Sequence, residues 1–150
     1  MVQKRLWGGY IPTSLREAVI YVGTMFRRKY GWIPVTYGRT YNGRHGFIVF
    51  HDMETGGRRR VYVVFQREPL HLADKLLGMS DKALTINLDA LRRVVSEGYD
   101  FIVWIDKNGV IRMVSPIYMA MLVDKNRWVR TTRSGETTAH IPIGYTYVVS

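Results

Sequence analysis

Three short turn signals, each flanked by two apolar runs, constrain the fold of this chain more than any other feature of the sequence. The strongest is the Asn-Gly pair at 108–109, because Asn-Gly favours the two-residue turn that joins antiparallel strands. A Gly-Gly pair at 56–57 and a Ser-Gly pair at 134–135 lie between further apolar runs. The chain is therefore predicted to build a sheet from hairpins. The predicted strands are 33–37, 47–50, 61–65, 99–105, 110–114, 128–132 and 137–143, with a last strand toward residue 149.

Three helices are predicted between and before these hairpins. Ser14 and Glu17 form a capping box, which marks the start of a helix whose apolar residues recur at three- and four-residue spacing. Asn87 is a good cap for a second helix, which ends near residue 98. Ser115 followed by Pro116 opens a third, short helix through residue 123, because proline is favoured in the first turn.

The remaining segments indicate how the domain is organised. Residues 38–46 and 69–83 are predicted as loops, the second with a short helical turn, and no repeat, low-complexity tract or linker interrupts the chain. A length of 150 residues is typical of one domain. We therefore expect a single α/β domain over residues 1–150, with a central mixed sheet built from hairpins and flanked by helices.

The hairpin around residues 56–57 is predicted to be buried on both faces, because its two runs are apolar at nearly every position. A turn centred on that Gly-Gly pair places Phe47 opposite Gln66 and His45 opposite Glu68. The polar side chains at the open end of this hairpin are therefore predicted to lie near one another.

The charge of the chain indicates its class of partner. Lys and Arg number 22 against 12 Asp and Glu, which gives a formal net charge of +10. An excess of this size favours a polyanion, and we expect nucleic acid, either DNA or RNA. The basic residues lie in clusters beside aromatic residues, so guanidinium groups would hold phosphates while rings stack on bases. The candidate nucleic-acid-binding residues are Arg27, Arg28, Lys29, Arg39, Arg44, Arg58, Arg59, Arg60, Arg127, Trp128, Arg130 and Arg133.

Other classes of function are disfavoured by what the sequence contains. The absence of cysteine excludes disulfides, cysteine-ligated zinc and thiol catalysis, and the histidines show no spacing typical of zinc ligands. The first residues lack the apolar core of a signal peptide, and no run approaches the length of a membrane span. We therefore expect a cytoplasmic protein without a membrane partner, and its composition is compatible with a thermophilic source.

The order of elements, capped helix, strand, hairpin, helix and hairpin, resembles the core of the restriction-endonuclease-like (PD-(D/E)XK) superfamily. The archaeal Holliday junction resolvases are small, basic members of it. Residues 90–105 resemble the family's helix and following strand, and 134–143 resemble a carboxy-terminal segment of some of these nucleases. The resemblance covers roughly residues 13–143 and implies a core that recognises DNA by its structure.

The family's catalytic site differs from the corresponding residues here. The family places an acid in the first helix, an Asp at the start of the second strand and Glu-x-Lys near the end of the third, and two carboxylates hold a divalent metal. Glu17 matches the helix acid, whereas the Asp position falls near His45. The Glu-x-Lys position falls on residues 65–67 or 66–68, and neither alignment restores the motif. Our main hypothesis is a nucleic-acid-binding protein without a cofactor, built on such a core whose metal site has been lost.

Three alternatives stay open. In an active nuclease, Glu17, His45, Gln66 and Glu68 would be catalytic, and Glu17 and Glu68 would bind Mg²⁺. The chain could instead be a single-strand-binding protein of unrelated fold, or a structural protein of a virus or plasmid. A homodimer is compatible with each of them.

Overall fold

A computed structural model of the chain describes residues 5–6, 9–67, 71–72 and 82–149. Its helices are α1 (Leu15–Tyr30), α3 (Leu88–Ser96), α4 (Pro116–Asn126) and the short 3-10 helix η1 (Ile143–Tyr145). The large sheet contains β3 (Ile33–Thr40), β4 (His45–His51), β5 (Arg58–Gln66), β8 (Phe101–Asp106), β9 (Ile111–Val114) and β12 (Tyr147–Val148). A second sheet contains β6 (His71–Leu72), β7 (Lys82–Asn87), β10 (Val129–Thr131) and β11 (Thr137–Pro142). Near the amino terminus, β1 (Arg5–Leu6) pairs with β2 (Gly9–Tyr10).

The large sheet is mixed and has the strand order β12-β9-β8-β5-β4-β3. Strands β3, β4 and β5 form an antiparallel meander, and β5 runs parallel to β8. The chain between β5 and β8 contains β7 and α3, which is the crossover that a parallel pair requires. The predicted α/β class and single domain are confirmed. Within the described ranges, no helix is long and apolar enough to cross a membrane.

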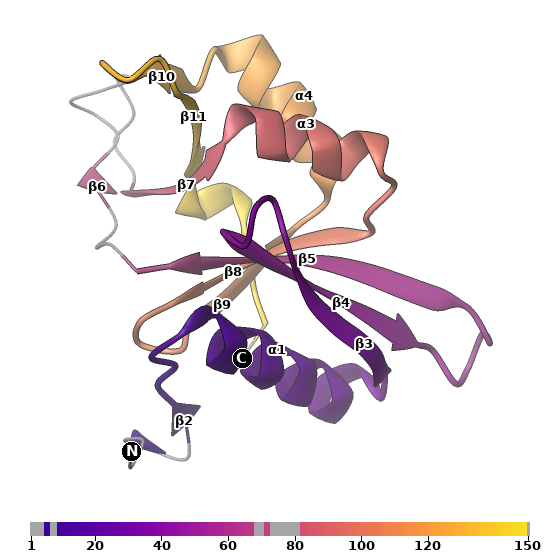
Figure 1. Cartoon of the computed structure of the whole chain (residues 1–150). Coiled ribbons are helices and arrows are strands. Elements are labelled where there is room, and N and C mark those ends of the chain that lie inside the picture. Colours follow the sequence, from indigo (N-terminus) through magenta and orange to yellow (C-terminus); the bar gives the residue numbers. More distant parts are fainter. Residues whose placement is uncertain (1–4, 7–8, 68–70, 73–81, 150) are drawn as a thin grey trace.

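Helix α1 covers one face of the large sheet (Figure 1). Ser14 caps its amino end by accepting a hydrogen bond from the Glu17 amide, as the capping box predicts. Val22 and Phe26 on its apolar stripe are fully buried against sheet residues such as Phe50. The predicted helix is therefore confirmed, because one stripe of its surface has a sheet face to cover.

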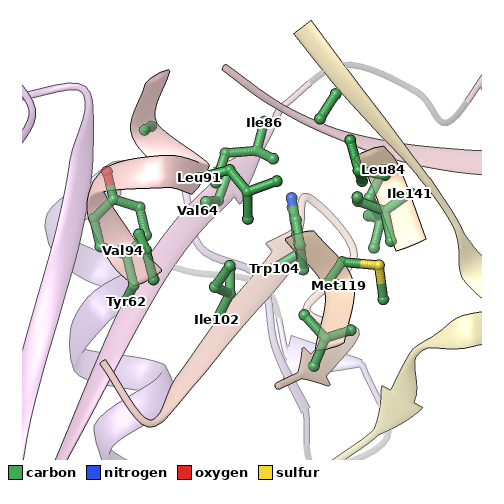
Figure 2. Packing of buried hydrophobic residues seen from close by; sticks show 14 of the residues in the cluster. Tyr62, Val64, Leu84, Ile86, Leu91, Val94, Ile102, Trp104, Met119 and Ile141 are labelled. Carbon is green, nitrogen blue, oxygen red and sulfur yellow. The ribbon is translucent and has the colours of Figure 1, made fainter. Parts of the chain in front are cut away.

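The second sheet, α3 and α4 cover the opposite face of the large sheet (Figure 1). Trp104 of β8 lies in the middle of this layer, where Figure 2 shows it near Leu84, Ile141 and Met119. Its side chain is completely buried, and its indole N–H donates to the backbone carbonyl of Thr85 at 2.9 Å. One residue therefore joins β8 of the large sheet to β7 of the second.

The predicted register of the β4–β5 hairpin is wrong. Phe47 pairs with Tyr62, and not with Gln66, because the loop runs from Asp52 to Gly57 and its centre precedes the Gly-Gly pair. The Asp52 carboxylate accepts a hydrogen bond from the amide of Glu54 at 3.0 Å, which begins the loop at Asp52. The hydrogen bond between Asp52 and Glu54 therefore determines where the loop begins, and the Gly-Gly pair lies at its end.

Parts of two segments predicted as loops are β-strands in the described residues. Strand β3 continues to Thr40, and a tight tip of four residues then returns the chain into β4 at His45. In the segment 69–83 the structure describes β6 and the start of β7, while 69–70 and 73–81 lie outside the described residues. Strand β7 is buried because β11 pairs along one of its edges and β6 along the other, a placement that no local pattern signals.

Replacing Gly56 with Val should destabilise the protein more than replacing Gly57 with Val. Gly56 has a φ of +73°, which a β-branched side chain adopts at a cost of roughly 1–2 kcal/mol. Gly57 does not have a positive φ. A Cβ added to it would meet only the Thr55 hydroxyl, at 3.3 Å. Urea denaturation of the two variants measures the difference, and equal midpoints would contradict this account of the turn.

Candidate functional site

A polar cavity of about 470 Å³ lies at the carboxyl end of β5. It is lined by the first residues of β4, the last residues of β5, the end of β7, the turn before β11 and Leu15 of α1. The parallel strands β5 and β8 end together here, since Gln66 pairs with Asp106. Open α/β sheets commonly bind ligands beyond the carboxyl ends of their strands. The position of the cavity therefore makes it the candidate functional site.

The cavity brings together His45 and Gln66, two of the residues predicted from the sequence. They are 8 % and 7 % exposed and come from neighbouring antiparallel strands. The prediction of their proximity did not depend on the exact register, because the start of β4 always lies beside the end of β5. Glu68, the partner predicted for His45, lies outside the described residues.

His45 has a defined set of neighbours. Its Nδ1 lies 2.6 Å from the hydroxyl oxygen of Tyr62, and the ring of Tyr41 stacks on the imidazole with centroids 5.3 Å apart. Burial, and secondarily the charge of Arg44, lowers the pKa of His45 to about 4. The imidazole is therefore neutral near pH 7.

Gln66 joins the cavity to the second sheet. Its Oε1 accepts from the Thr85 hydroxyl at 3.3 Å, while the indole of Trp104 donates to the Thr85 carbonyl. The wall of the cavity is therefore held by hydrogen bonds between the two sheets, and its residues are preorganised by the core.

The charged residues of the cavity are Arg44, Arg67 and Glu136 among those described. Arg44 and Glu136 form an ion pair at 3.1 Å, and the side-chain amide of Asn87 also donates to Glu136 at 2.9 Å. These hydrogen bonds, first that of Asn87 and then that of Arg44, lower the pKa of Glu136. Two guanidinium groups and one carboxylate leave the described lining with a formal charge of +1.

The described residues do not fit a magnesium site. Mg²⁺ prefers several oxygen ligands around one point, and Glu136, the described carboxylate in the lining, already binds Arg44 and Asn87. Glu17 does not belong to the described lining, and its carboxylate accepts from the Thr13 hydroxyl at 2.7 and 2.9 Å. No group of three or more metal-ligand side chains occurs among the described residues.

The basic residues predicted to bind nucleic acid lie in separate places. Arg58 and Arg59 begin β5 beside the carboxyl end of α1, because Arg59 lies 5.7 Å from the ring of Trp32 and pairs with Asp52 at 3.0 Å. Arg60 lies 4.3 Å from the Tyr99 ring and donates to the Glu97 carbonyl. The other members of the predicted set are exposed. They are Arg27, Arg28 and Lys29 at the end of α1, Arg39 on β3, Arg44 at the cavity, and Arg127, Arg130 and Arg133 around β10.

Of the aromatic residues predicted as stacking surfaces, Trp128 is buried, Tyr30, Trp32 and Tyr41 are partly buried, and Tyr37 is exposed. Trp128 is 8 % exposed and packs against Tyr145 with ring centroids 5.2 Å apart. Trp32 stacks on Tyr30 at 5.0 Å and on Phe101 at 6.0 Å. The faces of these rings are partly occupied by neighbouring rings, and the buried Trp128 offers little surface to a base.

Three residues at or beside the site were not among the predicted site residues: Tyr62, Arg67 and Glu136. Tyr62 lies within an apolar run and was treated as core, and Glu136 lies in a predicted turn. Arg67 and Glu136 line the cavity where the end of β5 and the turn before β11 meet, and Tyr62 contacts the site through His45. Predicting Glu136 as a site residue would have required knowing that the turn at 134–135 lies beside Arg44, at the start of β4.

The stability of the protein should fall as the pH is lowered from 6.5 to about 4. In that range His45 binds a proton in the unfolded chain, where its pKa is near 6.5, but remains neutral in the folded protein. The unfolded state therefore binds more protons, and the loss reaches about 3 kcal/mol at most. Urea denaturation across this range measures it. His45→Gln should remove this part of the pH dependence, and an unchanged slope in that variant would contradict the assignment.

Comparison with known proteins assigns this chain neither a family nor a function. No family model matches the chain, and neither a curated protein nor a solved structure matches it. The functional conclusion therefore depends on the chemistry of the cavity and of the basic surface around it.

Proposed function

We propose that this protein binds nucleic acid through its sugar-phosphate backbone, with the cavity at the end of β5 as the central contact. The observation that carries the proposal is the composition of that cavity. It combines the guanidinium groups of Arg44 and Arg67 with the buried polar side chains of His45 and Gln66, in a chain whose net charge is +10. Guanidinium groups bind phosphate oxygens with directed, charge-assisted hydrogen bonds.

The charge of the protein surface supports a polyanionic ligand. Carboxylates neutralise Arg44, Arg59 and Arg93 in the described ion pairs, whereas Arg27 and Arg28 are exposed and have no carboxylate within 4.0 Å among the described residues. The amino end of α1 also borders the cavity, where the helix dipole favours negative charge. Several phosphates along one strand could therefore contact the protein at once.

The covered aromatic rings favour binding to the backbone over stacking on single-stranded bases. Stacking requires an open ring face, and Trp32 and Trp128 both pack within the protein. A ligand recognised through phosphate positions is recognised by its shape, as in structure-specific DNA binding. We therefore place DNA of defined structure ahead of an unstructured single strand.

The topology adds support by analogy. The order α1, the meander β3-β4-β5, the crossover helix α3 and the parallel strand β8 resembles that of the restriction-endonuclease-like core, with β6 and β7 added before α3. Glu17 matches the acid of that family's first helix, but His45 and Gln66 lie at or near two other positions where the family has carboxylates. We infer a protein that keeps the DNA-binding surface of such a core and binds without metal-dependent cleavage.

A binding panel with a matched charge control tests the proposal. Fluorescence anisotropy would compare labelled four-way junction, duplex, single-stranded DNA and RNA. The double variant Arg44→Gln, Arg67→Gln should lose at least about tenfold in affinity, because each lost charge-assisted contact weakens binding. The control Arg27→Gln, Arg28→Gln removes the same charge at the far end of α1 and should lose less.

The other outcomes of this panel are equally informative. Equal losses in the two double variants would show that binding is spread over the surface and would overturn the central role of the cavity. Failure of the parent protein to bind at low salt would overturn the proposed function. Magnesium-dependent cleavage that Glu17→Gln abolishes would make the nuclease the answer, and large assemblies without nucleic acid would favour a structural protein.

A further inference from the structure

The pair formed by His45 and Tyr62 has a geometry that determines which imidazole nitrogen carries the proton. The Tyr62 hydroxyl lies 2.6 Å from Nδ1, and the two residues are 4 % and 8 % exposed. A bond this short between buried groups places one proton between oxygen and nitrogen, donated by one of them. The donor is decided by what else each group can bind.

The Tyr62 hydroxyl is the donor. Among the described residues its partner is Nδ1 of His45 and no other. If Nδ1 donated instead, the hydroxyl proton would have no acceptor, and an unsatisfied buried donor is costly. Nδ1 therefore accepts, and a neutral imidazole that accepts through Nδ1 carries its hydrogen on Nε2. Burial raises the pKa of Tyr62, which keeps the phenol protonated.

His45 lines the cavity, and its Nδ1 is the nitrogen bonded to Tyr62. Its Nε2 makes no hydrogen bond to another described residue, and Arg112 Nε is the one buried side-chain atom without a partner in the described part of the chain. We infer that Nε2 is the ring nitrogen that His45 presents to the cavity beside Arg44 and Gln66, because Tyr62 occupies Nδ1. The stacked ring of Tyr41, with an interplanar angle of 11°, fixes the plane of the imidazole.

We propose that Tyr62 is a positioning residue that holds His45 as the Nε2–H tautomer, and that this N–H donates to a phosphate oxygen of the bound nucleic acid. The inference rests on the proposed function and names the group that the same site recognises. The +1 charge of the described lining matches a phosphodiester, which carries one negative charge. A neutral N–H donor adds direction to the contact without adding charge.

Two measurements test this proposal, and the first does not depend on binding. Nitrogen-15 NMR of labelled protein at neutral pH distinguishes the tautomers, and we expect Nε2 of His45 to be protonated and Nδ1 to be bare. In Tyr62→Phe the hydroxyl is gone and the ring should become a mixture of tautomers. Tyr99→Phe is the control, because Tyr99 packs edge-on against Tyr62 at 5.3 Å and loses the same atom. A protonated Nδ1 in the parent protein would overturn the tautomer assignment.

The second measurement is DNA affinity in the same variants. His45→Gln places an amide N–H near the position of Nε2 and should keep most of the affinity, whereas His45→Asn is one methylene shorter and should lose about tenfold. Tyr62→Phe should lose several-fold and Tyr99→Phe should bind like the parent. Competition with inorganic phosphate and with a dinucleotide identifies the source of the oxygen, and only the dinucleotide should compete at low millimolar concentration.

The outcomes separate this inference from the proposed function. If the parent binds DNA and the Arg44, Arg67 variant does not, but Tyr62→Phe and His45→Asn bind like the parent, the proposed function stands and the role of His45 is overturned. If inorganic phosphate competes as well as the dinucleotide, the site binds free phosphate and the assignment to nucleic acid is overturned. If His45→Gln loses as much as His45→Asn, the loss reflects packing and the donor role is overturned.

Discussion

Raising the salt concentration from about 50 to about 200 mM should weaken DNA binding roughly a thousandfold, if about six phosphates are contacted. Each contact between a guanidinium or ammonium group and a phosphate releases a condensed counterion, so the logarithm of the affinity falls linearly with the logarithm of the salt concentration. The excess of 22 basic over 12 acidic residues makes this electrostatic contribution dominant. Anisotropy titrations at four or five salt concentrations give the slope.

The slope of log affinity against log salt concentration also reports how many phosphate contacts are made at the cavity, when the parent is compared with a cavity variant. The Arg44→Gln, Arg67→Gln variant should have a slope shallower by about two, because two phosphate contacts are lost. A variant that lowers the affinity without changing the slope would act through folding or shape instead. An affinity that stays flat across this salt range would refute backbone binding altogether.

Replacing Trp104 with Ala should lower the free energy of unfolding by about 3–5 kcal/mol. The side chain is completely buried between the two sheets, so its loss leaves a large cavity lined by residues such as Leu84 and Ile141. The substitution also removes the indole donor of the Thr85 carbonyl, which then stays buried without that partner. Urea denaturation followed by circular dichroism measures the change.

Trp104→Phe is the matched comparison. It keeps most of the aromatic volume but still removes the N–H, so it should cost less than Trp104→Ala. Because Thr85 also binds Gln66, both variants should disturb the cavity wall, whereas a core substitution beneath α1 such as Val22→Ala should not. A Trp104→Ala protein as stable as the parent would contradict the view that this residue joins the sheets.

Short-range chemistry in the sequence determined the helices and most of the hairpins. The Ser14 cap, the Asn87 cap and the turns near residues 108–109 and 134–135 each act within a few residues, so their signal is complete in a local stretch of chain. Net charge is likewise a sum over residues and needs no structure. For the same reason, the class of partner was predicted from composition alone.

The tertiary structure decided the features that depend on which distant segments meet. Strand β7 formed because β11 and β6 supplied its hydrogen-bonding partners. The same packing covered Trp128 and placed Tyr62 beside His45. Such contacts join residues far apart in sequence, and their free energy exists only once the sheets have assembled, so no local pattern records them.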